Sequence, residues 1–138
     1  MVTTKKISLQ SKGHGDIIDV TPQVKEQLAE TDISDGTVTL FISGSTAGIS
    51  TIEFESGLLS DFQGMWERNV PQDIPYKHDR AWGEGNGYSH VRASLLGASL
   101  VIPFSDKRLA LGTWQQIVLV DFDNRPRSRQ IVVQIMGE

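Results

Sequence analysis

The sequence predicts one domain that combines β-strands with helices. The 138 residues are enough for one hydrophobic core and too few for two ordinary domains, so we expect a single domain over residues 1–138. Segments with the alternating pattern of strands are interspersed with segments whose apolar residues recur every three or four positions, as in helices. One long segment, residues 108–122, has apolar residues on both faces, which suggests a sandwich or a strand shared with another subunit.

The composition is that of a soluble globular protein, with 38% apolar and 22% charged residues. No run approaches the roughly 18 apolar residues that span a bilayer, and the N-terminus has no apolar signal segment, so we expect a cytoplasmic protein without a membrane partner. The net charge of −4 argues against general nucleic-acid binding. Because there is no cysteine, any metal must be bound by histidine, carboxylate or carbonyl groups.

The first third of the chain predicts a strand, a helix and a second strand. Residues 2–9 alternate loosely and are typical of an edge strand. Thr21 and Pro22 form a helix start, and Val24 and Leu28 then face inward. The turn at Asp35-Gly36 leads into a β-rich run at residues 37–42.

A run of small residues, Gly44-Ser45-Thr46-Ala47-Gly48, follows that strand. Hydroxyl groups between glycines at a strand end can present donors to an anion, so Ser45 and Thr46 are candidate phosphate ligands. The same run can equally be a tight connection. The next strand, residues 49–54, includes Glu53, which alternation places opposite Ile52 and Phe54, either in solvent or in a cleft.

An amphipathic helix is predicted from about Gly57 to Asn69, followed by an extended loop that Pro71 and Pro75 enforce. We expect the apolar stripe of this helix to belong to the core; it consists of Leu58, Phe62, Met65 and Trp66.

A glycine-rich turn opens the next predicted helix, with Asn86 as its N-cap and Gly87 at its start. The free N–H groups at such a start, with Arg92 about one turn further on, can hold a phosphate or a carboxylate. We expect Val91 and Leu95 to seat this helix on the core.

Two histidines flank the glycine-rich turn. Reversal of the chain between His78 and His90 could bring their imidazoles together, as metal ligands or as an acid/base pair. The alternative is that each histidine is satisfied by a local hydrogen bond. His14, between two glycines, is interpreted as a loop residue.

The C-terminal part predicts strands at residues 100–104, 108–122 and 130–136, with a hairpin turn at residues 105–107. Gln115 and Gln116 point to opposite faces of the long strand, so one of them could reach a ligand. The arginines at residues 125–129 are interpreted as a solvated basic patch, with phosphate binding as the alternative.

Four segments together resemble the secondary thiamine-phosphate synthase (YjbQ-like) family, and the resemblance runs nearly end to end. They are Gly44 to Glu53, His78-Asp79, Asn86 to Gly97, and Arg108 to Gln116 with its Gly-Thr-Trp-Gln motif.

The resemblance implies a compact α+β domain with a β-sandwich or barrel-like sheet and two or three helices, assembled as a homotrimer. It also implies a weak thiamine-phosphate synthase activity. In that reaction hydroxymethylpyrimidine diphosphate loses pyrophosphate, and thiazole phosphate captures the pyrimidine methylene group.

The resemblance also suggests roles for residues. His78 and His90 match family histidines, which implies a divalent metal, Mg²⁺ or Zn²⁺; Glu53 matches a carboxylate, and Gln116 lies in the Gly-Thr-Trp-Gln motif. These four are the candidate catalytic residues. The candidate phosphate-binding residues are Ser45, Thr46, Asn86, Gly87 and Arg92.

This chain departs from the family at two positions. It has Gly44 and Tyr88 where many related sequences have histidine. Two other functions therefore stay open: metal-dependent hydrolysis of a small phosphorylated or carbonyl substrate, and non-catalytic ligand binding by a trimer.

Overall fold

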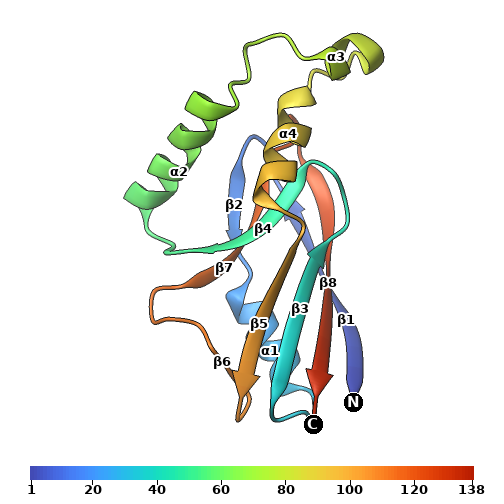
Figure 1. The fold of residues 1–138 in the computed structure, drawn as a ribbon, viewed down its shortest axis with the longest axis vertical. Coiled ribbons are helices and arrows are strands. Elements are labelled where there is room, and N and C mark those ends of the chain that lie inside the picture. The colour runs from blue at the N-terminus through green and yellow to red at the C-terminus, as the bar shows by residue number, and fades with distance from the viewer.

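Two antiparallel sheets form the framework of the computed structural model, which describes residues 1–138 (Figure 1). The first sheet has five strands in the order β1-β8-β3-β5-β6, and the second has three in the order β2-β7-β4. The strands are β1 (Val2–Ser11), β2 (Asp16–Asp19), β3 (Gly36–Ile42), β4 (Ala47–Ile52), β5 (Ser99–Ser105), β6 (Arg108–Leu109), β7 (Gln116–Asp121) and β8 (Arg127–Gly137).

Four helices accompany the sheets, where two or three were expected. The α+β class is confirmed, because strands and helices share one fold. The additional helix is short and lies directly before the glycine-rich turn, where the sequence predicted only a loop. The helices are α1 (Thr21–Ala29), α2 (Ser56–Asn69), α3 (Lys77–Trp82) and α4 (Gly87–Leu96).

The five-stranded sheet has one buried and one open face. Its edge strand β1 pairs with β8, as expected for an edge, and Met1 donates a hydrogen bond to the Gly137 carbonyl at 2.8 Å, so the two termini lie together (Figure 1). Alternating residues of β3 and β8 enter the core, including Leu40 and Val133. The opposite face exposes Phe41, Val101 and Met136.

β7 separates two hydrophobic clusters. Ile117 and Leu119 point into the main core, whereas Val118 and Val120 join the cluster beneath α2 and α4. The sequence prediction of a strand buried on both faces is therefore confirmed for this part of the chain, since residues 117–121 are all buried.

The prediction of one continuous strand over residues 108–122 is wrong. The segment divides into β6, an exposed connection and β7, with Trp114 72% exposed. Gly112 and the following polar residues interrupt the strand because they form a turn, closed by a hydrogen bond from the Gln115 N–H to the Gly112 carbonyl. The hairpin before it is as expected: Asp106 and Lys107 both have positive φ, the conformation of a two-residue hairpin turn.

The predicted buried stripe of α4 is also wrong. Val91 and Leu95 are exposed, at 42% and 66%. The helix instead buries a mixed polar face that includes Tyr88, Ser89 and Arg92, so its buried face is roughly 110° around the helix from the one expected. None of the four helices, α4 included, has the length and apolar character needed to span a membrane.

Candidate functional site

The structure brings His78 and His90 together. His78 lies on α3, which ends at Gly83 in a left-handed conformation, and His90 lies on the first turn of α4. Their ring centroids are 4.5 Å apart, with an angle of 46° between the planes. Nδ1 of His78 is buried without a hydrogen-bond partner, and it lies 3.7 Å from a carboxylate oxygen of Asp79. The two imidazoles are therefore close enough for one ligand to contact both of them.

Asp79 occupies the start of α4. Its Oδ1 accepts a hydrogen bond from the Gly87 N–H at 2.8 Å, so the first free N–H of the helix is already paired. Gly87 permits this approach, because a Cβ there would lie 2.7 Å from Cβ of Tyr76. An anion at this helix start would have to compete with Asp79.

Asn86 holds the N-cap position without capping the helix through its side chain. Its Nδ2 instead donates to Asp123 at 3.4 Å, and its Oδ1 is buried without a partner. Ser89, one turn into the helix, donates to the Phe122 carbonyl. The start of α4, with His90, is thereby fixed to the end of β7.

Two fully buried carboxylates lie beneath this junction. Arg129 donates to both oxygens of Asp121, at 2.7 and 2.9 Å, and Ser11 donates to the same carboxylate at 2.5 Å. Asp123 accepts hydrogen bonds from Thr46 at 2.9 Å and from Arg127 at 2.8 Å. We call these four charged residues, Asp121, Asp123, Arg127 and Arg129, the buried charge network.

The network keeps both aspartates ionised. Burial alone raises the pKa of Asp121, but hydrogen bonds from Arg129 and Ser11 outweigh that effect and lower the pKa below its usual value. Burial also raises the pKa of Asp123, and hydrogen bonds from Thr46, the Asn124 N–H and other donors more than compensate, so this pKa is lowered too.

Thr46 is hydrogen-bonded to two members of the buried charge network, whereas Ser45 is exposed. The Thr46 hydroxyl donates to Asp123 and accepts from Arg129, so it is fully used within the chain. Gly44 packs against the same arginine, because a Cβ there would lie 2.9 Å from Nη1 of Arg129. Ser45 lines a hollow of about 340 Å³ between this loop and the second half of α4.

Glu53 and Gln116 lie together, at a distance from the histidines. Both line an open hollow of about 430 Å³ that also includes Trp114. Glu53 comes directly after the end of β4 and is exposed with Phe54, so the alternation expected there does not apply. Thr46 and Glu53 flank the six residues of β4, and because they are seven positions apart in extended chain they are roughly 20 Å from each other.

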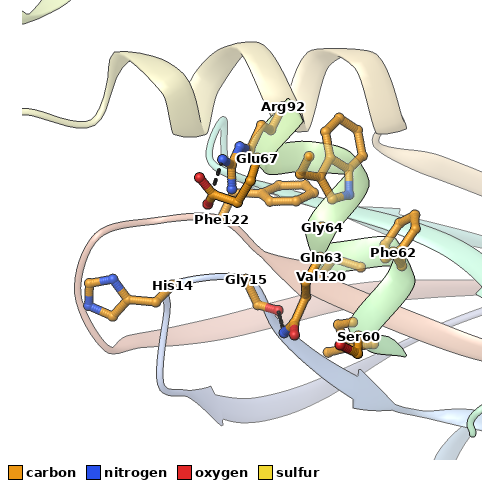
Figure 2. Close-up of a pocket in the computed structure, with 12 residues that line it drawn as sticks. His14, Gly15, Ser60, Phe62, Gln63, Gly64, Glu67, Arg92, Val120 and Phe122 are labelled. Carbon is orange, nitrogen blue, oxygen red and sulfur yellow. Dashed lines mark hydrogen bonds and ion pairs between the residues drawn. The ribbon is translucent and has the colours of Figure 1, made fainter. Parts of the chain in front are cut away.

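Arg92 is buried on the face of α4 toward α2. It donates to the Val70 carbonyl and pairs with Glu67, both at 3.0 Å, and its guanidinium lies 5.0 Å from the centre of the Tyr88 ring. Arg92 therefore does not join the Asn86-Gly87 helix start; it lines a separate cavity (Figure 2).

The histidine pair supplies two metal donors. The structure contains no group of three or more histidine, cysteine or carboxylate side chains placed to hold a metal ion. Gly44 has no side-chain donor, and the Tyr88 hydroxyl is buried without a partner. Since a zinc site takes at least three protein ligands, the donors of one chain are too few for a resident metal.

Sequence reasoning missed the buried charge network. The arginine run was interpreted as a solvated patch, but Arg129 is 8% exposed and Arg127 is only partly exposed. The available signal was the pair of aspartates at the end of an apolar strand, two positions apart and separated by one turn from arginines with the same spacing. Carboxylates that follow a buried strand need cationic partners.

Comparison with known proteins gives one consistent family. The family model described as UPF0047 protein YjbQ-like matches residues 5–138. The UPF0047 protein of Archaeoglobus fulgidus is 38% identical over 131 residues, covering 95% of this chain and 99% of that protein. The UPF0047 protein YjbQ of Escherichia coli O157:H7 is 31% identical, with 97% of each chain covered.

Solved structures agree with the fold. A YbjQ-like protein of unknown function from Sulfolobus solfataricus superposes with a TM-score of 0.90 at 29% identity, over the whole of both chains. A yjbq/upf0047 family protein from Clostridium acetobutylicum gives a TM-score of 0.87 at 34% identity, over 96% of this chain and 99% of that one.

Proposed function

We propose that this chain, which belongs to the UPF0047 YjbQ-like family, is a transferase of the thiamine-phosphate synthase type, the activity that its resemblance to the secondary thiamine-phosphate synthase family implies. The substrates are hydroxymethylpyrimidine diphosphate and thiazole phosphate. The observation that supports the proposal is the 4.5 Å pairing of His78 with His90 beside an anchored helix start.

The reaction needs charge stabilisation more than covalent chemistry. The bond between the pyrimidine methylene carbon and the diphosphate oxygen breaks, and the electron pair leaves with pyrophosphate. The thiazole nitrogen then donates its lone pair to the methylene carbon and becomes cationic. A protonated imidazole of the pair can donate to the departing oxygen, and the second imidazole can hold it in place.

The phosphate groups need further donors. Ser45 is the exposed hydroxyl of the loop before β4, and we assign it a direct phosphate contact. Thr46, Asn86 and Gly87 are already hydrogen-bonded within the chain, so in this proposal they position the loop and the helix start.

A divalent cation, Mg²⁺ or Zn²⁺, is part of the proposal as an ion that accompanies the diphosphate. Mg²⁺ is commonly bound through substrate phosphates and other oxygen ligands, whereas two imidazoles suit Zn²⁺ or another transition metal. His78 and His90 are the protein donors that we assign to it.

We also propose a homotrimer. Exposed Val91 and Leu95 form an apolar i, i+4 stripe on the outer face of α4, next to His90 in sequence, and contiguous apolar surface of this kind is typical of an interface. In the trimer, Glu53 and Gln116 of one subunit would complete the site around the histidines of another, where the carboxylate stabilises the cationic product.

The test is product formation by purified protein with both substrates and Mg²⁺. We expect thiamine phosphate from the wild type, a loss of roughly 100-fold or more in His90→Ala, and unchanged turnover in Lys77→Ala, on the exposed surface of α3. Chelation of the cation should abolish the reaction. Equal turnover in His90→Ala and Lys77→Ala would contradict the role given to the histidine pair.

A further inference from the structure

A second cavity lies between α2 and the three-stranded sheet, on a different face of α4 from the histidine pair. Its volume is about 420 Å³, within the range of small-molecule sites. His90 and Arg92 are two residues apart, which is about 200° around a helix, so the residue that lines this cavity points away from His90. The cavity is thus separate from the proposed active site.

One wall of the cavity is aromatic. Phe62, Trp66 and Phe122 all line it. Trp66 packs edge-on against both neighbours, with ring centroids 5.7 Å from Phe62 and 4.9 Å from Phe122. Such a wall accepts a planar ring.

Arg92 supplies a positive charge at a fixed position in the same cavity. Its side chain is 6% exposed, and the Val70 carbonyl and the Tyr88 ring hold it in place independently of any ligand. Its carboxylate partner Glu67 is 58% exposed and lies at the edge of the cavity, where Figure 2 shows the pair joined. A surface carboxylate can turn into water at little cost, but the buried guanidinium then needs another anion.

A polar group without a partner lies in the same wall. Nε1 of Trp66 is buried and has no hydrogen-bond acceptor, although the residue is only 6% exposed. Buried indole N–H groups normally have an acceptor. Trp66 is also the only buried residue of α2.

We propose that this cavity binds a small aromatic molecule with one carboxylate or phosphate group. The ring lies against Trp66 and Phe122, and the anionic group replaces Glu67 on Arg92. The inference does not depend on the proposed transferase activity, because it concerns binding at residues outside the histidine pair.

The experiment uses a protein whose only tryptophan is Trp66, made with Trp82→Phe and Trp114→Phe, both at exposed positions. The readouts are the fluorescence and the indole ¹H–¹⁵N resonance of Trp66 during titration with benzoate and with phenyl phosphate. Phenol and inorganic phosphate serve as the two half-ligands. We expect saturable binding of at least one aromatic anion, about tenfold or more tighter than either half-ligand; the tighter anion identifies the preferred group.

Substitutions on α2 test the exchange with Glu67. Glu67→Gln should strengthen binding several-fold because it removes the competing carboxylate, whereas a purely structural ion pair predicts no gain. Asp61→Asn, exposed on the same helix and outside the cavity, removes the same charge and should leave the affinity unchanged. Arg92→Leu should abolish binding, and His90→Ala should retain it.

Two results would overturn the proposal. One is the absence of saturable binding by both aromatic anions at millimolar concentration. The other is an equal effect of Glu67→Gln and Asp61→Asn. Neither result bears on turnover, which is measured separately with His90→Ala.

Discussion

The imidazoles of His78 and His90 lie in contact, with ring centroids 4.5 Å apart and ring planes tilted by 46°. Groups that act as a unit show non-additive losses when they are replaced. We therefore expect His78→Ala and His90→Ala each to lower kcat by roughly 100-fold or more, and the double substitution to lower it little further. Steady-state kinetics of the three variants measure this, with Lys77→Ala on the exposed surface of α3 as the control. A double variant whose loss equals the product of the single losses would show that the two histidines act separately.

The buried charge network should dominate the stability of the region around the site. Asp123→Asn removes a fully buried carboxylate from Arg127, whose side chain is 31% exposed, so we expect a destabilisation of about 1–3 kcal/mol, less than for a fully buried pair. Asp106→Asn is the matched control, because Asp106 is exposed at a turn where asparagine tolerates the positive φ. Urea denaturation of both variants gives the free energies of unfolding. Equal free energies of unfolding for the two variants would show that the network does not stabilise the fold.

The same network predicts a dependence of stability on pH. The folded-state pKa values of Asp121 and Asp123 are lowered, so the unfolded chain binds more protons than the folded chain below the unfolded pKa of about 3.9. Their contribution is fully present above that pKa and is lost as the pH falls toward the folded values. We expect the free energy of unfolding to fall below about pH 4, with a shallower slope in Asp123→Asn. An identical slope in both proteins would contradict this prediction.

Replacing each of two helical glycines with alanine should change the stability of the protein in opposite directions. Gly87→Ala places a Cβ 2.7 Å from the Tyr76 Cβ, and we expect a destabilisation of about 1–3 kcal/mol with loss of the His78–His90 alignment. In Gly64→Ala the nearest atom is the end of the flexible Arg68 side chain, at 3.3 Å, so we expect a gain of about 0.5–1 kcal/mol. Thermal unfolding of both proteins measures the difference. A stable Gly87→Ala variant would show that α3 and α4 need not approach so closely.

Subunit mixing tests whether Glu53 and His90 belong to one site. Within one chain, the residues at the two ends of β4 are roughly 20 Å apart. In the proposed homotrimer, Glu53→Ala and His90→Ala subunits that are unfolded and refolded together should regain part of the activity, because some interfaces then contain both native residues. Each variant refolded alone is the control. If mixing restores no activity, or if the mass in solution is that of a monomer, the proposal of a site shared between subunits is wrong.

Local sequence patterns predicted the elements whose signals lie close together in the chain. The α1 start at Thr21-Pro22 and the helix α2 are examples, although only Trp66 of the predicted α2 stripe is buried and its other three residues are partly exposed. The approach of His78 to His90 was also accessible, since only a short turn separates them. Hydrophobic periodicity failed for α4, because this helix buries Ser89 and Arg92 and leaves Leu95 exposed.

Contacts between distant parts of the chain could not be predicted from local sequence patterns. The Ser11 hydroxyl reaches Asp121, and Thr46 reaches Asp123, across separations that no local pattern records. The separation of Glu53 from the histidines follows from the antiparallel pairing of β4 with β7, which places Ile52 opposite Gln116. Motif spacing alone does not contain that information.

The most direct measurement for the proposed transfer reaction is the ratio of pyrophosphate to thiamine phosphate released by the wild-type protein. Transfer predicts equal amounts of the two products, and no pyrophosphate when thiazole phosphate is omitted. Pyrophosphate or phosphate release from the pyrimidine diphosphate alone, without thiamine phosphate, would contradict the transfer reaction and identify the protein as a hydrolase.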